Sequence, residues 1–273
     1  MLASAFFLCI CLIACETTPK EKISELKRFE FSQPQMGVPF RIVLYAPTEK
    51  EATEAATAAF KRISELNEKL SDYETDSELN RLSRTSGHEA PTAVSDDLWR
   101  VLVRGQEIAE LSEGAFDITV GPAVVLWRKA RRVKELPSPE SLTNAMKAVG
   151  YKKLLLDPAF QSAQLLVPHM KLDLGGIAKG FAADEALRIL REFGVRRALV
   201  AASGDIAVSE APPGKKGWRI EVAPLDVTNA PPKRFVLLSH AAVSTSGDTF
   251  QRLEINGKRY SHIVDPATGI GLT

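Results

Sequence analysis

Apolar residues recur three and four positions apart from residue 49 to residue 70, with charged residues between them. This spacing predicts a long amphipathic helix. A second helix is predicted from Ser95, a residue type that caps helices, to Gly114. A third should run from Ser138-Pro139 to Gly150, because proline suits the first helical turn and glycine often ends a helix. A fourth is predicted to begin near Ile177 and to end at Gly194.

Short apolar runs predict strands, most of them in the second half of the chain, at residues 41–45, 153–156, 164–167, 198–202, 218–222, 235–238 and 250–255. Asn256-Gly257 follows the last run and predicts a type I′ hairpin with residues 258–260. The basic run 128–134 is most simply a solvated linker. Helices and strands interleave early and hairpins dominate later, so we expect an α+β fold with mixed or antiparallel sheets.

The segment Asp173-Leu-Gly-Gly-Ile-Ala-Lys-Gly180 separates the apolar run that ends at Val167 from the fourth helix. Adjacent glycines let a backbone approach a ligand closely, and a helix that starts there presents unpaired N–H groups. Phosphate is the ligand that such a turn usually binds. The segment is neither a P-loop nor a dinucleotide fingerprint, so a tight turn with a surface lysine remains the alternative.

The N-terminus reads as an export signal. Residues 2–14 are almost wholly apolar but too short to span a bilayer comfortably, and they end in Leu12-Ile-Ala-Cys15, which resembles a bacterial lipobox. We expect residues 1–14 to be a lipoprotein signal peptide, Cys15 to carry the lipid, and residues 15–28 to be a tether. This places the protein in the bacterial cell envelope, facing the periplasm or the cell exterior. A buried N-terminal helix or strand is the alternative.

The composition indicates an ordinary globular protein. The 273 residues are 45% apolar and 25% charged, and 35 basic residues balance 34 acidic ones. A net charge of +1 provides no field that would attract nucleic acid, so we expect no nucleic-acid partner.

Seven short segments, taken in order, are similar to those of the ApbE family, the FAD:protein FMN transferases. They are Met36-Gly37, Ser71-Asp-Tyr-Glu-Thr-Asp-Ser-Glu78, Gly114-Ala-Phe-Asp117, residues 173–180, Ser203-Gly-Asp205, Ser244-Thr-Ser-Gly247 and His262-Ile-Val-Asp-Pro-Ala-Thr-Gly269. The resemblance covers about residues 35–269 and implies an ApbE-like domain over residues 29–273, with its ligand site in a cleft built from loops.

The resemblance also implies a reaction, its partners and its residues. The family transfers FMN from FAD to a Ser or Thr hydroxyl of an acceptor protein, typically a subunit of a membrane redox complex, with Mg²⁺ as cofactor and AMP as leaving group. His262 corresponds to the proposed catalytic base, and the carbonyl of Gly176 to a metal ligand. The residues expected to contact FAD are Met36, Tyr73, Ala115, Phe116, Asp117, Asp173, Lys179 and Val264.

These assignments agree with what the residues could do unaided, because pyrophosphate cleavage needs charge neutralisation and a base for the incoming hydroxyl. For His262, a structural histidine that bonds to the Asp-Pro turn is the alternative. The sequence ends at Thr273, before the family's later Asp and Thr metal ligands, so we expect the C-terminal part of the domain to be missing. An FAD pyrophosphatase and a non-catalytic flavin-binding lipoprotein remain competing hypotheses.

Overall fold

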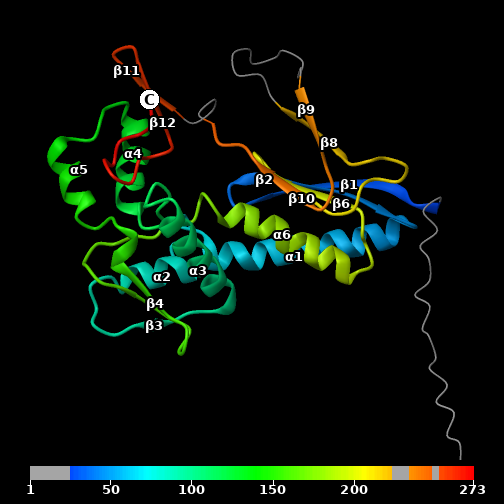
Figure 1. Ribbon diagram of the computed structural model, residues 1–273, viewed down its shortest axis with the longest axis horizontal. Coiled ribbons are helices and arrows are strands. Elements are labelled where there is room, and N and C mark those ends of the chain that lie inside the picture. Colours follow the sequence, from blue (N-terminus) through cyan, green and yellow to red (C-terminus); the bar gives the residue numbers. More distant parts are fainter. Residues whose placement is uncertain (1–24, 223–233, 248–251) are drawn as a thin grey trace, which may run out of the picture.

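The computed structural model describes residues 25–222, 234–247 and 252–273 (Figure 1). The α-helices are α1 (Glu49–Leu70), α2 (Glu78–Arg84), α3 (Asp96–Leu111), α4 (Gly121–Val133), α5 (Pro139–Met146) and α6 (Ala178–Glu192). The strands are β1 (Lys27–Gln35), β2 (Val38–Ala46), β3 (Thr92–Ala93), β4 (Leu154–Asp157), β5 (Ser162–Leu165), β6 (Ala198–Ala202), β7 (Asp205–Val208), β8 (Trp218–Val222), β9 (Arg234–Leu238), β10 (Ala241–Ser244), β11 (Arg252–Ile255) and β12 (Lys258–Ser261). Every pairing between these strands is antiparallel, which confirms the α+β prediction.

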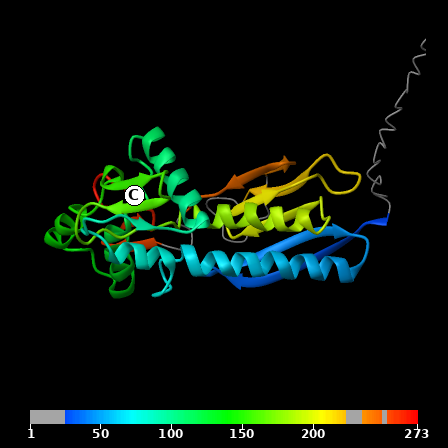
Figure 2. The ribbon, with the colours of Figure 1, turned by 90° about the horizontal axis from the view of Figure 1, so that it is seen from below.

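The main sheet has the strand order β1-β2-β6-β7-β10, and α1 and α6 lie side by side across one of its faces (Figures 1 and 2). Side chains of a strand alternate between the two faces. On β2, Phe40, Ile42 and Leu44 therefore enter the core under the helices, whereas Val43 belongs to a second cluster on the other face. Trp218 of β8 joins that second cluster, so β8 covers part of the opposite face.

The rest of the chain forms a second body at one end of the two long helices (Figures 1 and 2). It contains α2, α3, α4, α5 and the small sheet β3-β5-β4. The hairpin β11–β12 packs on α4 through Leu253, which shares a buried cluster with Trp127 and Val264. Among the described residues, no helix is both long and apolar enough to cross a membrane.

The predicted helices agree closely with the observed ones. Helix α1 has the predicted bounds, and the Thr48 side chain accepts a hydrogen bond from the Glu51 N–H as part of a capping box. Helices α3, α5 and α6 lie within the predicted ranges. Asn256 and Gly257 have φ of 52° and 74°, the positive values that the predicted type I′ turn requires.

Three predictions are wrong. Residues 128–133 continue α4 rather than forming a solvated linker, because the apolar residues Ala123, Trp127 and Ala130 bury one face of that helix. Strand β5 ends at Leu165, and only an isolated bridge from Lys171 to Val120 precedes the glycine turn, so the strand does not lead directly into it. Strand β1 begins at Lys27, which removes residues 27 and 28 from the predicted tether. The signal peptide and most of the tether lie outside the described residues.

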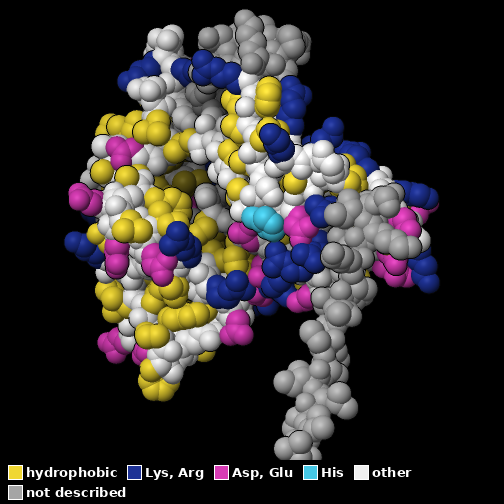
Figure 3. Space-filling view, turned by 45° about the vertical axis from the view of Figure 1, so that its right-hand side comes forward, with side chains coloured by type: hydrophobic (Ala, Val, Ile, Leu, Met, Phe, Trp, Pro, Cys, Tyr) yellow, Lys and Arg dark blue, Asp and Glu magenta, His cyan; other side chains and the backbone are white. Residues whose placement is uncertain are grey.

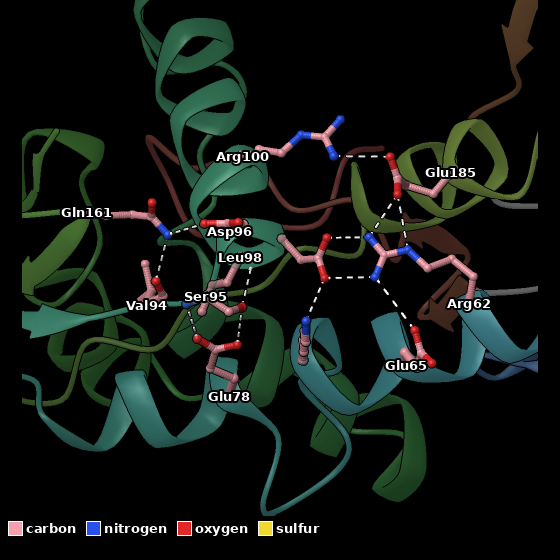
Figure 4. Close-up of polar contacts among 12 residues, drawn as sticks. Arg62, Glu65, Glu78, Val94, Ser95, Asp96, Leu98, Arg100, Gln161 and Glu185 are labelled. Atoms are coloured by element: carbon pink, nitrogen blue, oxygen red, sulfur yellow. Dashed lines mark hydrogen bonds and ion pairs between the residues drawn. The ribbon is translucent and has the colours of Figure 1, made fainter. Parts of the chain in front are cut away.

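A network of ion pairs joins α1, α3 and α6 (Figure 4). Arg62 on α1 donates from Nη1 to Asp97 Oδ2 at 2.9 Å and from Nη2 to Glu185 Oε2 at 2.8 Å. Asp97 also accepts from Lys69 at 2.6 Å, and Glu185 accepts from Arg100 at 3.1 Å. Because Glu185 lies on α6, the network fixes the helix that follows the glycine turn.

Candidate functional site

Two hairpin turns meet at one end of the main sheet. Met36 and Gly37 form the turn between β1 and β2, and both have positive φ, 50° and 75°. Ser203 and Gly204 form the turn between β6 and β7. Phe40 pairs with Ala202 across β2 and β6, so the register brings both turns to the same sheet end. Met36 is half-buried and packs against the main core.

The Ser203-Gly204-Asp205 and Ser244-Thr245 segments are in direct contact. Thr245 N–H donates to Gly204 O at 2.9 Å, and Ser244 Oγ donates to Asp205 Oδ1 at 2.6 Å. A Cβ atom on Gly204 would lie 2.6 Å from Thr245 O, which no side chain can tolerate. This close approach explains the glycine, and the contact unites two segments that lie forty residues apart in the sequence.

Lys179 brings the glycine turn to the same sheet end. Its Nζ donates to Gly175 O at 2.8 Å and lies 3.9 Å from Asp205 Oδ2. Helix α6 begins at Ala178 without a side-chain cap, whereas α1, α2, α3 and α5 each have a Ser or Thr cap. The sequence predicted unpaired N–H groups at this helix start, but those of Ile177 and Ala178 both donate to Leu174 O, at 2.9 and 2.8 Å, so the prediction holds at most for the N–H groups that follow.

Phe116 lies against the glycine turn. A Cβ atom on Gly176 would be 3.1 Å from Phe116 Cε2, so the ring borders the backbone that is predicted to hold the pyrophosphate. Asp173 N–H donates to Ile118 O at 2.8 Å, which joins the two loops directly. Phe116 is half-buried, and Ala115 and both glycines are exposed, so this backbone is open to a ligand.

Asp117 faces inward and is 6% exposed. Its Oδ1 accepts from the N–H and the hydroxyl of Thr119, both at 2.7 Å, and Thr119 Oγ1 accepts from Gly150 N–H at 2.8 Å. Burial raises the pKa of the Asp117 carboxyl, and these hydrogen bonds oppose the rise. The carboxylate therefore has a structural role in this loop, and its predicted contact with FAD stays a prediction.

Tyr73 is 73% exposed, and the Arg128 guanidinium lies over its ring at 4.2 Å from the centroid. Arg128 also pairs with Asp72 and, at 3.0 Å, with Asp173 Oδ2. Sequence reasoning missed Arg128 because it lies in the run interpreted as a linker. Burial and the nearby charge of Asp72 raise the pKa of Asp173, and hydrogen bonding from Gly175 and the charges of Arg128 and Lys179 oppose the rise.

The C-terminal segment reaches the site through α4. Trp127 Nε1 donates to Gly269 O at 2.7 Å and shares a buried cluster with Val264. The neighbouring residue on the same helix, Arg128, contacts the glycine turn. Val264 is 8% exposed, and His262 is half-buried just after the end of β12. Helix α4 therefore contacts both the segment that follows His262 and the glycine turn.

The described residues do not form a complete magnesium site. They contain no group of three or more His, Cys, Asp or Glu side chains that could hold a metal ion. Two carboxylates of the candidate site have other partners, since Asp173 pairs with Arg128 and Asp205 accepts from Ser244. Mg²⁺ needs near-octahedral oxygen coordination, and the Gly176 carbonyl supplies one ligand at most.

The comparisons with known proteins agree with this geometry. The ApbE family model matches residues 36–273. The FAD:protein FMN transferase of Haemophilus influenzae is 32% identical over 212 residues, 76% of this chain and 61% of that protein. The Salmonella typhimurium enzyme of the same name is 32% identical over 276 residues, 98% of this chain and 76% of that protein. The chain thus spans less than two thirds of the Haemophilus relative.

Solved structures of ApbE proteins are also similar to this chain. The crystal structure of the ApbE protein of Thermotoga maritima superposes with a TM-score of 0.80 at 30% identity, covering 90% of this chain and 78% of that one. The flavin transferase ApbE of Vibrio cholerae superposes with a TM-score of 0.78 at 29% identity, covering 91% of this chain and 79% of that one. Since the family model covers most of the sequence and these structures share its fold, the chain belongs to the ApbE family.

Proposed function

We propose that the protein is an FAD:protein FMN transferase. The observation that carries the proposal is that three segments similar to those of this family lie against the glycine turn or its flanking residues. Phe116 borders Gly176, Arg128 pairs with both Asp72 and Asp173, and Asp205 lies 3.9 Å from Lys179. In the proposed reaction a Ser or Thr hydroxyl of the acceptor attacks the phosphorus on the FMN side of the FAD pyrophosphate. The bond to the AMP oxygen breaks, AMP leaves, and FMN remains attached through a phosphoester.

The chain's own residues bind and orient the dinucleotide. The exposed Gly176 backbone and the first turn of α6 are proposed to offer hydrogen-bond donors for the pyrophosphate, and Lys179 adds a positive charge beside them. Gly175 N–H already donates to Asp173 Oδ1. Phe116 and Met36 supply apolar surface at the edge of this turn, and Tyr73 an exposed aromatic ring. Val264 anchors the segment of His262 to α4 and is proposed to approach FAD through its backbone.

His262 is proposed as the general base that takes the proton of the acceptor hydroxyl. A neutral imidazole nitrogen can accept the proton of an attacking hydroxyl. The residue lies between β12 and the Asp265-Pro266 turn, where Asp265 accepts from Ala267 N–H at 2.9 Å. Strand β12 holds the backbone before His262, and the Val264 anchor and this turn hold it after the imidazole.

The metal dependence and the cellular setting rest on the family resemblance. We propose that Mg²⁺ is required, so treatment with EDTA should abolish transfer and added Mg²⁺ should restore it. We also propose that the acceptor is a subunit of a membrane redox complex and that a lipid on Cys15 attaches the protein to the cell envelope. The Cys15→Ser variant should then appear in the soluble fraction while its isolated domain keeps its turnover.

The decisive experiment incubates the full chain with FAD, Mg²⁺ and an acceptor protein that carries a flavinylation site. Flavin fluorescence that remains on the acceptor after denaturation supports the transferase. Free FMN and AMP without labelled protein would instead indicate an FAD pyrophosphatase. Intact FAD after incubation would indicate a flavin-binding protein without catalysis. An acceptor whose target Ser or Thr is replaced by Ala is the matched control and should remain unlabelled.

A further inference from the structure

Arg128 joins two segments that the family resemblance treats separately, the Tyr73 loop and the glycine turn. It comes from α4, pairs with Asp72 in the Tyr73 loop, and pairs with Asp173 at the glycine turn. The side chains of Asp72 and Asp173 are 7% and 11% exposed, and that of Arg128 is 25% exposed. A planar guanidinium offers donors in a fixed fork, so one arginine can hold two carboxylates in a defined geometry where a lysine could not.

The same guanidinium supports the Tyr73 ring. It lies over one face of the ring at 4.2 Å from the centroid, within the range of a cation–π contact. Tyr73 is nevertheless 73% exposed, so its other face is open to solvent. An exposed tyrosine in a polar loop would ordinarily sample several rotamers, and the stacked guanidinium restricts them.

The loop itself is anchored from the other side. Asn80 Nδ2 on α2 donates to Asp72 O at 3.1 Å and to Glu74 O at 2.8 Å, so the backbone on both sides of Tyr73 is fixed. On the turn side, Asp173 Oδ1 accepts from Gly175 N–H at 2.8 Å while its Oδ2 pairs with Arg128. Arg128 therefore helps to fix two elements, the Tyr73 ring by direct contact and the Gly175 backbone through Asp173.

We propose that Arg128 is a positioning residue for dinucleotide binding, which holds Tyr73 as a stacking platform beside the glycine turn. The proposal rests on the proposed function in taking FAD as the ligand. The open face of Tyr73 receives one planar ring system of FAD, adenine or isoalloxazine, while the turn receives the pyrophosphate. Arg128 contacts neither ring in this arrangement and acts through Tyr73 and Asp173.

The test compares Arg128→Met with Arg128→Lys in the full chain. Arg128→Met removes both ion pairs and the stacked cation while keeping the apolar stem. It should raise the dissociation constant and the KM for FAD about tenfold or more, with little change in kcat. Arg128→Lys keeps the charge but not the fork, so it should restore part of the affinity. Arg132→Met, on the same helix at an exposed position, is the matched control and should bind FAD like the wild type.

A double-mutant cycle with Tyr73→Ala separates positioning from general destabilisation. If Arg128 acts through Tyr73, then Arg128→Met should weaken FAD binding much less in the Tyr73→Ala background than in the wild type. Competition by ADP and by FMN against FAD, before and after Tyr73→Ala, identifies which ring uses the platform. The ligand whose affinity falls is the one that stacks.

Two results would overturn the proposal. One is wild-type FAD affinity in Arg128→Met, and the other is an additive cycle with Tyr73→Ala. Failure of the proposed function is a distinct result, because it would appear in the wild-type protein as FAD binding without covalent transfer. FAD affinity is measured by quenching of flavin fluorescence, and a matching melting temperature shows that each variant is folded.

Discussion

Arg62 and Arg128 each bridge two carboxylates from distant parts of the chain, but their surroundings differ. Arg62 lies between three helices, and its partners Asp97 and Glu185 have further cations in Lys69, Arg100 and Arg188. Hydrogen bonding from Arg62 and Lys69, opposed by burial, lowers the pKa of Asp97 to about 2. The carboxylate of Asp97 is thus more stable in the folded protein than in water.

In the cluster around Arg128, the contributions to the carboxylate pKa have the opposite net effect. Burial and the charge of Asp72 together outweigh the favourable partners of Asp173, so the pKa of Asp173 is raised. Its charge is therefore held in an unfavourable environment beside an exposed glycine turn and an exposed tyrosine. Such an arrangement is expected where a ligand supplies the missing interactions, whereas the Arg62 network is complete without one. The contrast agrees with the proposal that the first cluster stabilises the fold and the second takes part in FAD binding.

The largest predicted effect is a loss of catalytic rate in a variant whose stability is unchanged. His262→Ala should lower the rate of FMN transfer by about 10² to 10⁴-fold, the range for loss of a general base. Binding of FAD and the melting temperature should change little, since Val264 and Gly269 hold the segment on α4. Single-turnover transfer assays alongside thermal unfolding provide the measurement. Transfer at the wild-type rate would show that another group takes the proton.

The second predicted effect is a loss of stability in a variant that keeps its activity. Arg62→Met leaves Asp97 and Glu185 in the helix interface with fewer partners and should lower the free energy of unfolding by about 3 kcal/mol. The value lies at the low end for a broken buried pair because Lys69 and Arg100 remain. Urea unfolding measures the loss, and turnover per folded molecule should be unchanged. The control, Arg104→Met, breaks an exposed pair with Glu107 and should change stability by about 0.5 kcal/mol or less.

A pair of isosteric variants compares the two clusters directly. Asp97→Asn should lower the free energy of unfolding by about 2 kcal/mol, because it removes a charge that the fold stabilises. Asp173→Asn should be neutral or slightly stabilising, since it removes a charge that the fold disfavours while its side-chain oxygen can still accept from Gly175. FAD affinity should fall only in Asp173→Asn. The reverse pattern would remove the distinction between the clusters.

The smallest effect is a dependence on acid pH. A lowered carboxyl pKa adds stability above its unfolded value of 3.8, and this stability is lost as pH falls toward the folded value of about 2. We therefore expect about 1 to 2 kcal/mol of the free energy of unfolding to disappear between roughly pH 5 and pH 2 because of Asp97. The Asp97→Asn variant should lack this component. An equal loss in that variant would assign the acid sensitivity to other groups.

The sequence predicted well the elements whose signals are local. Helix α1 combines an apolar stripe with the Thr48 capping box, so both its faces and its start could be predicted. Helix α4 was missed altogether, because its buried face uses the small residues Ala123 and Ala130, the latter among basic neighbours. Helix α2 was also missed, since it follows the polar loop directly and spans only seven residues.

The candidate site was predictable as a set of segments but not as a set of contacts. The two carboxylate partners of Arg128 lie 56 and 45 residues away in the sequence, so no local pattern could indicate the cluster. The inward orientation of Asp117 depends on Thr119, whose hydroxyl accepts from the Gly150 N–H, a partner that it meets only in the fold. The space-filling view mixes basic and acidic side chains over the visible face, so charge alone would not have located the site either (Figure 3).

The most direct test of FMN transfer measures the amounts of the two products, AMP and acceptor-bound flavin. Wild-type protein, FAD and an acceptor should yield AMP and acceptor-bound flavin in equal amounts, and the acceptor mass should rise by that of FMN less one water. AMP in excess of bound flavin, or an acceptor of unchanged mass, would contradict the claim that these converging loops transfer FMN to a protein hydroxyl.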